Sequence, residues 1–175
     1  MAAMGMTRAR EPRAGRPGLQ LDTPIGVLTL WAVPEGLRAI EFGAHLGELR
    51  PERQEKEQPG ERVLTEAARQ LGEYFAGTRK AFELPLVIEG TEFERAVWEI
   101  LRSIPYGQTM SYGQLAADLG RPSAARAVGR ASGSNPLPIV IPCHRLVGSR
   151  GELTGFGGGL PIKLRLLELE GAVLC

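Results

Sequence analysis

The first half of the chain alternates apolar and polar residues in two short runs, at residues 19–33 and 36–42. Alternation of this kind is typical of strands that turn one face toward a core. The runs are interrupted at Thr23-Pro24 and at Pro34-Glu35-Gly36, where turn-forming residues gather. The pattern therefore predicts a small antiparallel meander.

Helical spacing replaces this alternation over residues 61–77. Apolar side chains recur there on one face, at Val63, Leu64, Ala67, Ala68, Leu71, Tyr74 and Phe75. Residues 81–88 predict one more short strand, and the polar segment 47–60 predicts a solvated loop. Together these elements predict an α+β domain over residues 19–90. Residues 1–18, rich in Arg, Pro and Gly without apolar periodicity, predict a disordered leader.

The second half is mostly helical in its pattern. Thr91 with Glu94, and Ser111 with Gln114, have the spacing of capping boxes that begin helices. The second of these helices ends at Gly120, and a third is expected over 122–132 because proline suits a first helical turn. Two short helices joined by a tight turn are typical of a helix-turn-helix. We therefore expect an α+β protein whose C-terminal domain, 91–175, is mostly helical and contains this motif.

The third helix carries two arginines among very small side chains. Arg126 and Arg130 are surrounded by Ala124, Ala125, Ala127, Gly129 and Ala131. A nearly bare helix allows its backbone to approach a narrow DNA groove closely. Close packing against neighbouring helices would explain the small residues equally well, so both interpretations stay open.

Composition restricts the function classes. The chain has 175 residues, of which 43% are hydrophobic and 23% charged, which is typical of a globular protein. No apolar run reaches the roughly 18 residues of a membrane helix, and an intracellular location is expected. The net charge of +1 argues against a surface that is basic throughout, but residues 105–151 hold five arginines against one acid. That local excess suits contact with a phosphate backbone.

Only two cysteines occur, Cys143 and Cys175, and neither has the CxxC spacing of a zinc or redox site. Cys143 follows an apolar run between prolines, which we expect to be a buried strand, and a thiol held there has little freedom. A lone cysteine is more often a buried, inert thiol. His144 and Arg145 change this balance because cationic neighbours lower a thiol pKa. His144 would meet Cys143 only if the chain turns there or a water bridges them.

The sequence from Phe93 to Gly171 closely resembles the O6-alkylguanine-DNA alkyltransferases, also called methylated-DNA-protein-cysteine methyltransferases. The family's PCHR motif stands at 142–145 within IPCHRLVGSRGELTGFGGGLPIK, and ARAVGRASGSNP precedes it. Before Thr91 the resemblance is general. It implies direct, stoichiometric repair: a methyl or other alkyl group moves from O6 of guanine, and from O4 of thymine, to a cysteine of a protein consumed in a single turnover.

The resemblance also implies residue roles. Cys143 is the expected nucleophile, His144 its water-mediated general base, and Glu170 the carboxylate that orients His144. Asn135 corresponds to the hinge asparagine, Tyr112 to the tyrosine that donates to the guanine ring, and Arg126 to the arginine that fills the space of a flipped base. The expected DNA contacts are Tyr112, Ser123, Ala125, Arg126, Ala127, Gly129 and Arg130. The expected alkyl-guanine pocket comprises Pro138, Leu146, Ser149, Phe156, Gly157 and Lys163.

Further expectations concern partners and departures from the family pattern. The resemblance implies a monomer that binds the minor groove of lesion-bearing duplex DNA without a cofactor, in the cytoplasm, or in the nucleus of a eukaryote. No metal is expected, because His45 is the sole Cys or His in the N-terminal half. Phe156-Gly157 replaces the family's usual tyrosine and small polar residue, which predicts a roomier, less polar pocket mouth.

Other functions remain as alternatives. A non-catalytic lesion sensor of the alkyltransferase-like type would bind the same DNA but lacks the cysteine that stands here as Cys143. A cysteine hydrolase using Cys143, His144 and Asn135 would leave the third helix unexplained, and a plain DNA-binding regulator would not need a reactive thiol.

Overall fold

The computed structural model describes residues 18–44 and 60–172. Three expectations concern residues outside these ranges: nearly all of the leader, the loop 47–60 except Gly60, and the terminal Cys175. Within the described ranges, no helix is long and apolar enough to cross a bilayer.

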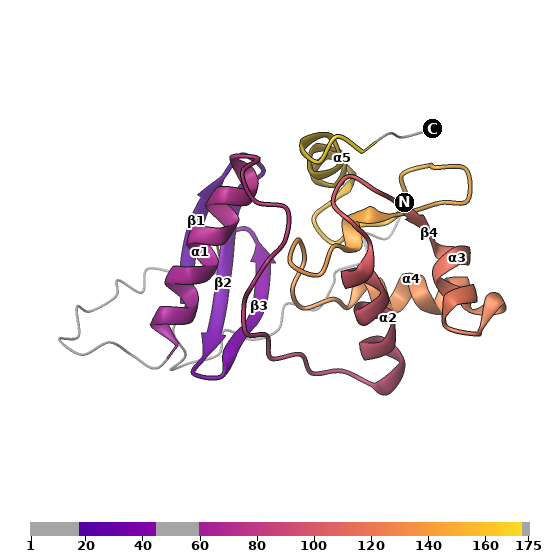
Figure 1. Ribbon diagram of the computed structural model, residues 1–175, viewed down its shortest axis with the longest axis horizontal. Coiled ribbons are helices and arrows are strands. Elements are labelled where there is room, and N and C mark those ends of the chain that lie inside the picture. The colour runs from indigo at the N-terminus through magenta and orange to yellow at the C-terminus, as the bar shows by residue number, and fades with distance from the viewer. Residues whose placement is uncertain (1–17, 45–59, 173–175) are drawn as a thin grey trace, which may run out of the picture.

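The N-terminal part, the described residues up to 90, is built on the predicted meander. Strands β1 (Gly18–Thr23), β2 (Gly26–Val33) and β3 (Gly36–Phe42) form an antiparallel sheet in that order, with turns where the sequence predicted them. Helix α1 (Glu61–Phe75) lies against the sheet (Figure 1). Leu28 and Leu30 of β2 and Leu71 of α1 are fully buried, so the predicted apolar faces form a core.

The segment expected as a strand at 81–88 forms only one bridge, between Leu37 and Leu86. Around it the Leu37 N–H donates to Pro85 O at 2.8 Å, and Val87 N–H donates to Leu37 O at 2.9 Å. Pro85 has no N–H to give, so a ladder cannot extend through it. The prediction of a regular strand was therefore wrong, although the segment does cover the edge of β3.

The C-terminal part, residues 91–172, is mostly helical, as expected. Its helices are α2 (Glu92–Ser103), α3 (Tyr112–Asp118), α4 (Ala125–Gly133) and α5 (Leu160–Leu169). Strands β4 (Met110–Ser111) and β5 (Leu146–Val147) form a short parallel pair. Both predicted capping boxes are present. The helix expected at 122–132 begins instead as a 3₁₀ turn over Pro122–Ala124, which is common at helix starts.

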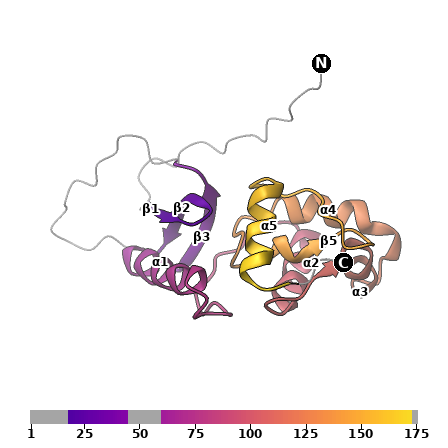
Figure 2. The same cartoon turned by 90° about the horizontal axis from the view of Figure 1, so that it is seen from above.

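Helix α5 lies on the side of the C-terminal part that faces the sheet and α1 (Figure 2). A direct backbone bond also joins the two parts, from Ile40 N–H of β3 to Pro136 O at 2.9 Å. Pro136 belongs to the segment that leads to Cys143. The N-terminal part therefore lies against two segments that carry predicted site residues.

Candidate active site

Cys143 begins a 3₁₀ turn, Cys143–Arg145, directly after Pro142. Its side chain is nearly closed to solvent, with the residue 7% exposed. The Cys143 N–H donates to Ile141 O at 2.8 Å, and the buried strand expected here is absent. Ile139, two residues earlier, has φ 75°, the one positive φ of a non-glycine among the described residues. A β-branched residue in this region is strained, so the chain is held in a turn that the apolar run did not predict.

Asn135 ties this segment together with both ends of its amide. Its Nδ2 donates to Ile141 O at 2.8 Å, and its Oδ1 accepts from Leu137 N–H at 3.0 Å. Ile141 O thus accepts from Asn135 and from Cys143 N–H at once. The expected hinge asparagine therefore fixes the backbone just before the thiol.

His144 and Glu170 form a buried pair. His144 Nε2 lies 2.8 Å from Glu170 Oε1, with both side chains closed to solvent. A carboxylate acceptor at Nε2 favours the tautomer with its proton there, which leaves Nδ1 as an acceptor. His144 Nδ1 is buried and has no hydrogen-bond partner among the described residues. Burial lowers the pKa of His144 against the opposing effect of Glu170, so the ring is held as a neutral base.

Arg145 serves the carboxylate rather than the thiol. Its Nε donates to Glu170 Oε2 at 2.8 Å, one terminal nitrogen donates to Glu170 Oε1 at 2.9 Å, and the other donates to Ile104 O at 2.5 Å. Burial by itself would raise the pKa of Glu170, but hydrogen bonds from His144 and Arg145 hold it far below its usual value. Glu170 is thus a permanent anion, although a helix-end glutamate is ordinarily exposed.

The thiol pKa differs from the sequence expectation. Burial raises the pKa of Cys143 to about 11, while Asn135 and Lys163 act in the opposite direction. The expected net lowering of this pKa was wrong, because the Arg145 charge is already paired with Glu170 and the His144 ring is held neutral, so neither offsets burial. At neutral pH the resting site therefore holds a protonated thiol at Cys143 and a neutral imidazole at the next residue, His144.

Lys163 is fully buried on α5 and joins strand β5 to the loop before α5. Its Nζ donates to Leu146 O at 2.5 Å and to Thr154 O at 2.7 Å. Burial lowers the pKa of Lys163 to about 8, and the nearby Cys143 opposes this shift. A thiolate formed at Cys143 would therefore gain from the neighbouring ammonium.

The helix-turn-helix presents its arginines to solvent. Arg126 and Arg130 are exposed and form no ion pair with any residue in the described ranges. A Cβ built on Gly129 would lie 3.7 Å from the Tyr112 ring, so the α4 backbone lies close to that ring. Val128 and Ala131 are buried. Helix packing thus explains part of the small-residue pattern, while the arginines and Ser123 remain on an open face.

Comparisons with known proteins identify the family of this chain. Residues 20–88 match the model of the 6-O-methylguanine DNA methyltransferase, ribonuclease-like domain, and residues 92–172 match that of the 6-O-methylguanine DNA methyltransferase, DNA binding domain. A methylated-DNA–protein-cysteine methyltransferase of Methanosarcina acetivorans is 45% identical over 86% of this chain and 96% of its own length. A protein of the same name from Mycolicibacterium paratuberculosis is 48% identical over 86% and 89%.

Among solved structures, Mycobacterium tuberculosis OGT in complex with DNA superposes with TM-score 0.74 and 43% identity, over 87% of this chain and 91% of that one. The chain belongs to the 6-O-methylguanine DNA methyltransferase family. The resemblance seen in the sequence is thereby confirmed.

The residues expected to form the methyltransferase's alkyl-guanine pocket lie in different surroundings. Pro138, Leu146 and Lys163 are buried, whereas Ser149 and Gly157 are exposed. The Phe156 ring lies edge-on to Phe42 of β3, with centroids 5.5 Å apart at 65°. This side chain therefore connects the loop before α5 to the N-terminal sheet. The roomier, less polar mouth stays a prediction.

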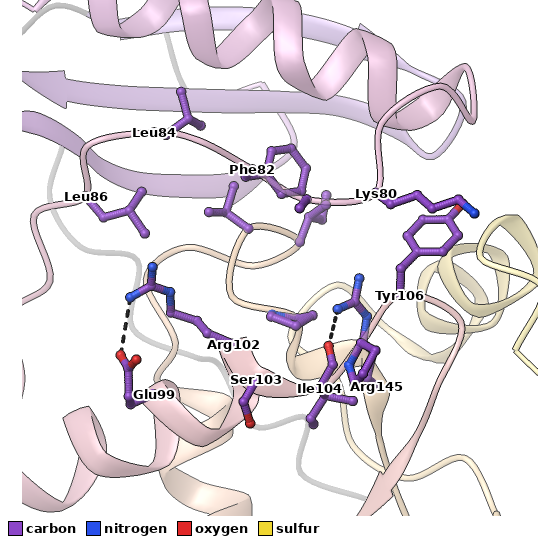
Figure 3. Close-up of a pocket in the computed structure, with 15 residues that line it drawn as sticks. Lys80, Phe82, Leu84, Leu86, Glu99, Arg102, Ser103, Ile104, Tyr106 and Arg145 are labelled. Carbon is purple, nitrogen blue, oxygen red and sulfur yellow. Dashed lines mark hydrogen bonds and ion pairs between the residues drawn. The ribbon is translucent and has the colours of Figure 1, made fainter.

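A cavity of about 380 Å³ lies between residues 80–86 of the N-terminal part and α2 of this methyltransferase (Figure 3). Arg102, paired with Glu99, and Arg145, bonded to Ile104 O, reach toward it from below. Pro142 and Arg145 line the cavity but Cys143 does not. We therefore do not place a reacting base there.

Two residues of the site were missed by sequence reasoning. Tyr74 OH of α1 donates to Glu170 Oε1 at 2.7 Å, and Gly107 N–H donates to Glu170 Oε2 at 3.2 Å. Tyr74 was predicted only as a core residue of its helix, and no local pattern marks a contact 96 residues away. Gly107 has φ 78°, and its Cα faces Glu170 O so closely that a Cβ would lie 2.8 Å away.

Proposed function

We propose that this chain repairs DNA by transferring an alkyl group from O6 of guanine to Sγ of its own Cys143, once per molecule. The observation that carries the proposal is the buried pair of Glu170 with His144, the residue after Cys143, in which Nδ1 of His144 has no partner among the described residues and is available as a base. Curated relatives named methylated-DNA–protein-cysteine methyltransferase support it.

The chemistry begins with a proton transfer. His144 Nδ1 takes the thiol proton of Cys143, directly or through a bridging water, and Glu170 stabilises the imidazolium that forms. The thiolate then attacks the alkyl carbon: an S–C bond forms, and the C–O6 bond breaks with its electron pair passing to the guanine. Tyr112, donating to the ring, and Lys163, near the thiolate, stabilise charge as it shifts.

The raised pKa of Cys143 suits this sequence of events. A thiol that is not ionised at rest is protected from stray oxidants and electrophiles, because the thiolate is the reactive form. The proton leaves only when an alkyl carbon is held against the sulfur. The product is a thioether with no low-energy route back to a thiol, so the protein is consumed in proportion to the lesions repaired.

The DNA partner follows from the helix-turn-helix. O6 of guanine lies inside the paired stack, so the base must be turned out of the duplex. In this proposal α4 enters the minor groove, where Ala125, Ala127 and Gly129 permit close approach. Arg126 fills the space that the base leaves, while Ser123, Arg130 and Tyr112 contact the phosphates.

The turned-out base lies, in this proposal, among Pro138, Leu146, Ser149, Phe156, Gly157 and Lys163. Asn135 holds the wall that carries Cys143. O4-alkylthymine presents a similar alkyl group and is proposed as a second substrate. The protein acts as a monomer, with residues 19–90 and 91–175 as its two domains, in the compartment that holds the DNA.

The decisive experiment is intact-protein mass spectrometry after incubation with duplex DNA containing O6-methylguanine. We expect a gain of one methyl, mapped to Cys143. Cys143→Ala should gain none, and Cys175→Ala, the matched control, should react as the unaltered protein does. Tight lesion binding without mass gain would indicate a non-catalytic sensor, and repeated turnover of an ester without modification would indicate a hydrolase.

A further inference from the structure

Tyr74 lies on α1 in the N-terminal part and is fully buried. Three aromatic rings surround it, with centroids at 5.3 Å for Phe75, 5.5 Å for Phe82 and 6.1 Å for Tyr106. Its hydroxyl passes beyond this cluster and donates to Glu170 Oε1 at 2.7 Å. The hydroxyl of this buried tyrosine therefore bonds the carboxylate that, in the proposed mechanism, orients His144.

The same oxygen serves His144. Glu170 Oε1 accepts from Tyr74 OH, from His144 Nε2 and from a terminal nitrogen of Arg145. Oε2 accepts from Arg145 Nε and from Gly107 N–H. A carboxylate offers about four lone-pair sites, so the donors compete for electron density. Each donor to Oε1 weakens the pull of that oxygen on the imidazolium form of His144.

We propose that Tyr74 is a positioning residue for alkyl transfer, through which the N-terminal part fixes Glu170 and limits the basicity of His144. This inference rests on the proposed function. The phenol is a constant donor, because burial and the adjacent Glu170 raise the pKa of Tyr74 far above its usual value. It therefore adds a hydrogen bond without adding a charge.

Charged and titratable groups from several segments face His144 and Tyr74. His144 is faced by Glu170 and Lys163 of the α5 region and by Arg145 of its own turn, and Lys163 in turn is faced by Cys143. Tyr74 is faced by Glu170, Arg145 and Tyr106. Among these groups, Tyr74 is the neutral donor that comes from α1, so its removal changes no net charge.

The test compares Tyr74→Phe with the unaltered protein in single-turnover transfer from lesion DNA between about pH 5 and 8, where histidine titrates. Without the phenol, Oε1 attracts the imidazolium more strongly, and the pKa of His144 rises. We expect the acid limb of the rate profile, the pH range over which the transfer rate falls as His144 takes up a proton, to move up by about half a pH unit. The plateau rate should fall several-fold because Glu170 is less firmly held. Affinity for DNA should not change.

Tyr106→Phe is the matched control. Its hydroxyl donates to Leu169 O at 3.0 Å, one residue before Glu170, and does not bond the carboxylate. This variant loses one phenol hydroxyl in the same region, so we expect an acid limb at the original pH. A limb that moves equally in both variants would overturn the proposal, because it would report general loosening of the helix end.

A second substitution keeps the proposal testable if Tyr74→Phe does not fold. Placing 3-fluorotyrosine at position 74 retains the ring and makes the hydroxyl a stronger donor, so the acid limb should move to lower pH. The ring signals of His144 in NMR should follow the same direction, and the chain has only one other histidine, His45. An unmoved limb and unmoved His144 signals would refute the role of Tyr74. Absence of transfer by the unaltered protein would instead refute the proposed function.

Discussion

His144 Nε2 lies 2.8 Å from Glu170 Oε1 although the two residues are 26 positions apart in the chain, and both side chains are closed to solvent. The carboxylate also receives two bonds from Arg145. An anion this deeply buried is stable only when such donors surround it. The pair consequently connects the end of α5 to the turn that carries Cys143, and in the proposed mechanism it also takes up the thiol proton.

Replacing Glu170 with glutamine should damage both roles. The substitution leaves the buried Arg145 without its counter-charge, and breaking a buried ion pair costs about 3 to 5 kcal/mol. We expect transfer to slow by about a hundredfold or more, since the imidazolium loses its stabilising anion. Urea unfolding and single-turnover kinetics measure the two effects. Glu168→Gln, an exposed position two residues earlier, should change neither.

Acidification should destabilise the protein from about pH 6.5 downward, where unfolded histidine begins to bind a proton. Burial lowers the pKa of His144, so the unfolded chain binds a proton that the folded chain refuses. The stability contributed by neutral His144 is complete above about pH 6.5 and declines as pH falls toward its lowered pKa. The slope cannot exceed about 1.4 kcal/mol per pH unit for one proton.

The corresponding measurement is the free energy of unfolding from urea titrations at several pH values. His144→Gln retains an amide that can donate to Glu170 but cannot titrate, so its curve should be flatter across this window. A slope that persisted undiminished in this variant would assign the effect to other groups.

Cys143 should react slowly with iodoacetamide at neutral pH in a Cys175→Ala background. Its pKa is raised to about 11 by burial, and alkylating reagents attack the thiolate. We expect the rate to rise steeply above about pH 9 and show no plateau near pH 7. Lesion DNA should methylate the same thiol readily at pH 7. A reactive thiolate with a midpoint near neutrality would contradict this account of a base-activated thiol.

Arg126→Ala should slow repair of duplex DNA by about ten- to a hundredfold, because nothing then fills the space of the turned-out base. A lesion in single-stranded DNA has less stacking to overcome and should be affected less. Arg165→Ala removes the same charge from an exposed position on α5 and is the matched control. Equal loss in both variants would indicate a general electrostatic effect.

Elements determined by neighbours within a few residues could be predicted from the sequence. The capping boxes of Thr91 with Glu94 and of Ser111 with Gln114 formed as expected, because each joins a side chain to a backbone three residues away. The meander followed from alternation and turn residues. The strand predicted at residues 81–88 did not form, because a strand also needs a continuous ladder to a neighbouring strand. Pro85 has no N–H to donate, so this segment makes a single bridge to β3.

For the candidate site, the residues could be named from the sequence, but their contacts and pKa values could not. Its nucleophile, base, carboxylate and hinge could be named from the motif around Cys143 and the end of the chain, and their roles remain proposals. The use of Arg145 by Glu170 rather than by the thiol could not be predicted, nor could the raised pKa of Cys143. Burial and ion pairing depend on distances between segments that no spacing along the chain encodes.

By itself the sequence determined the family and most of the helices and turns, and it supplied Cys143 as the proposed nucleophile. Only the tertiary structure decided that Tyr74 of α1 bonds Glu170, that Phe42 lies against Phe156, and that the thiol of Cys143 and the neutral imidazole of His144 are both buried. The physical reason is that local bonds form within one turn of chain, whereas desolvation and charge pairing arise only when the Cys143 turn, the end of α5 and the N-terminal part come together.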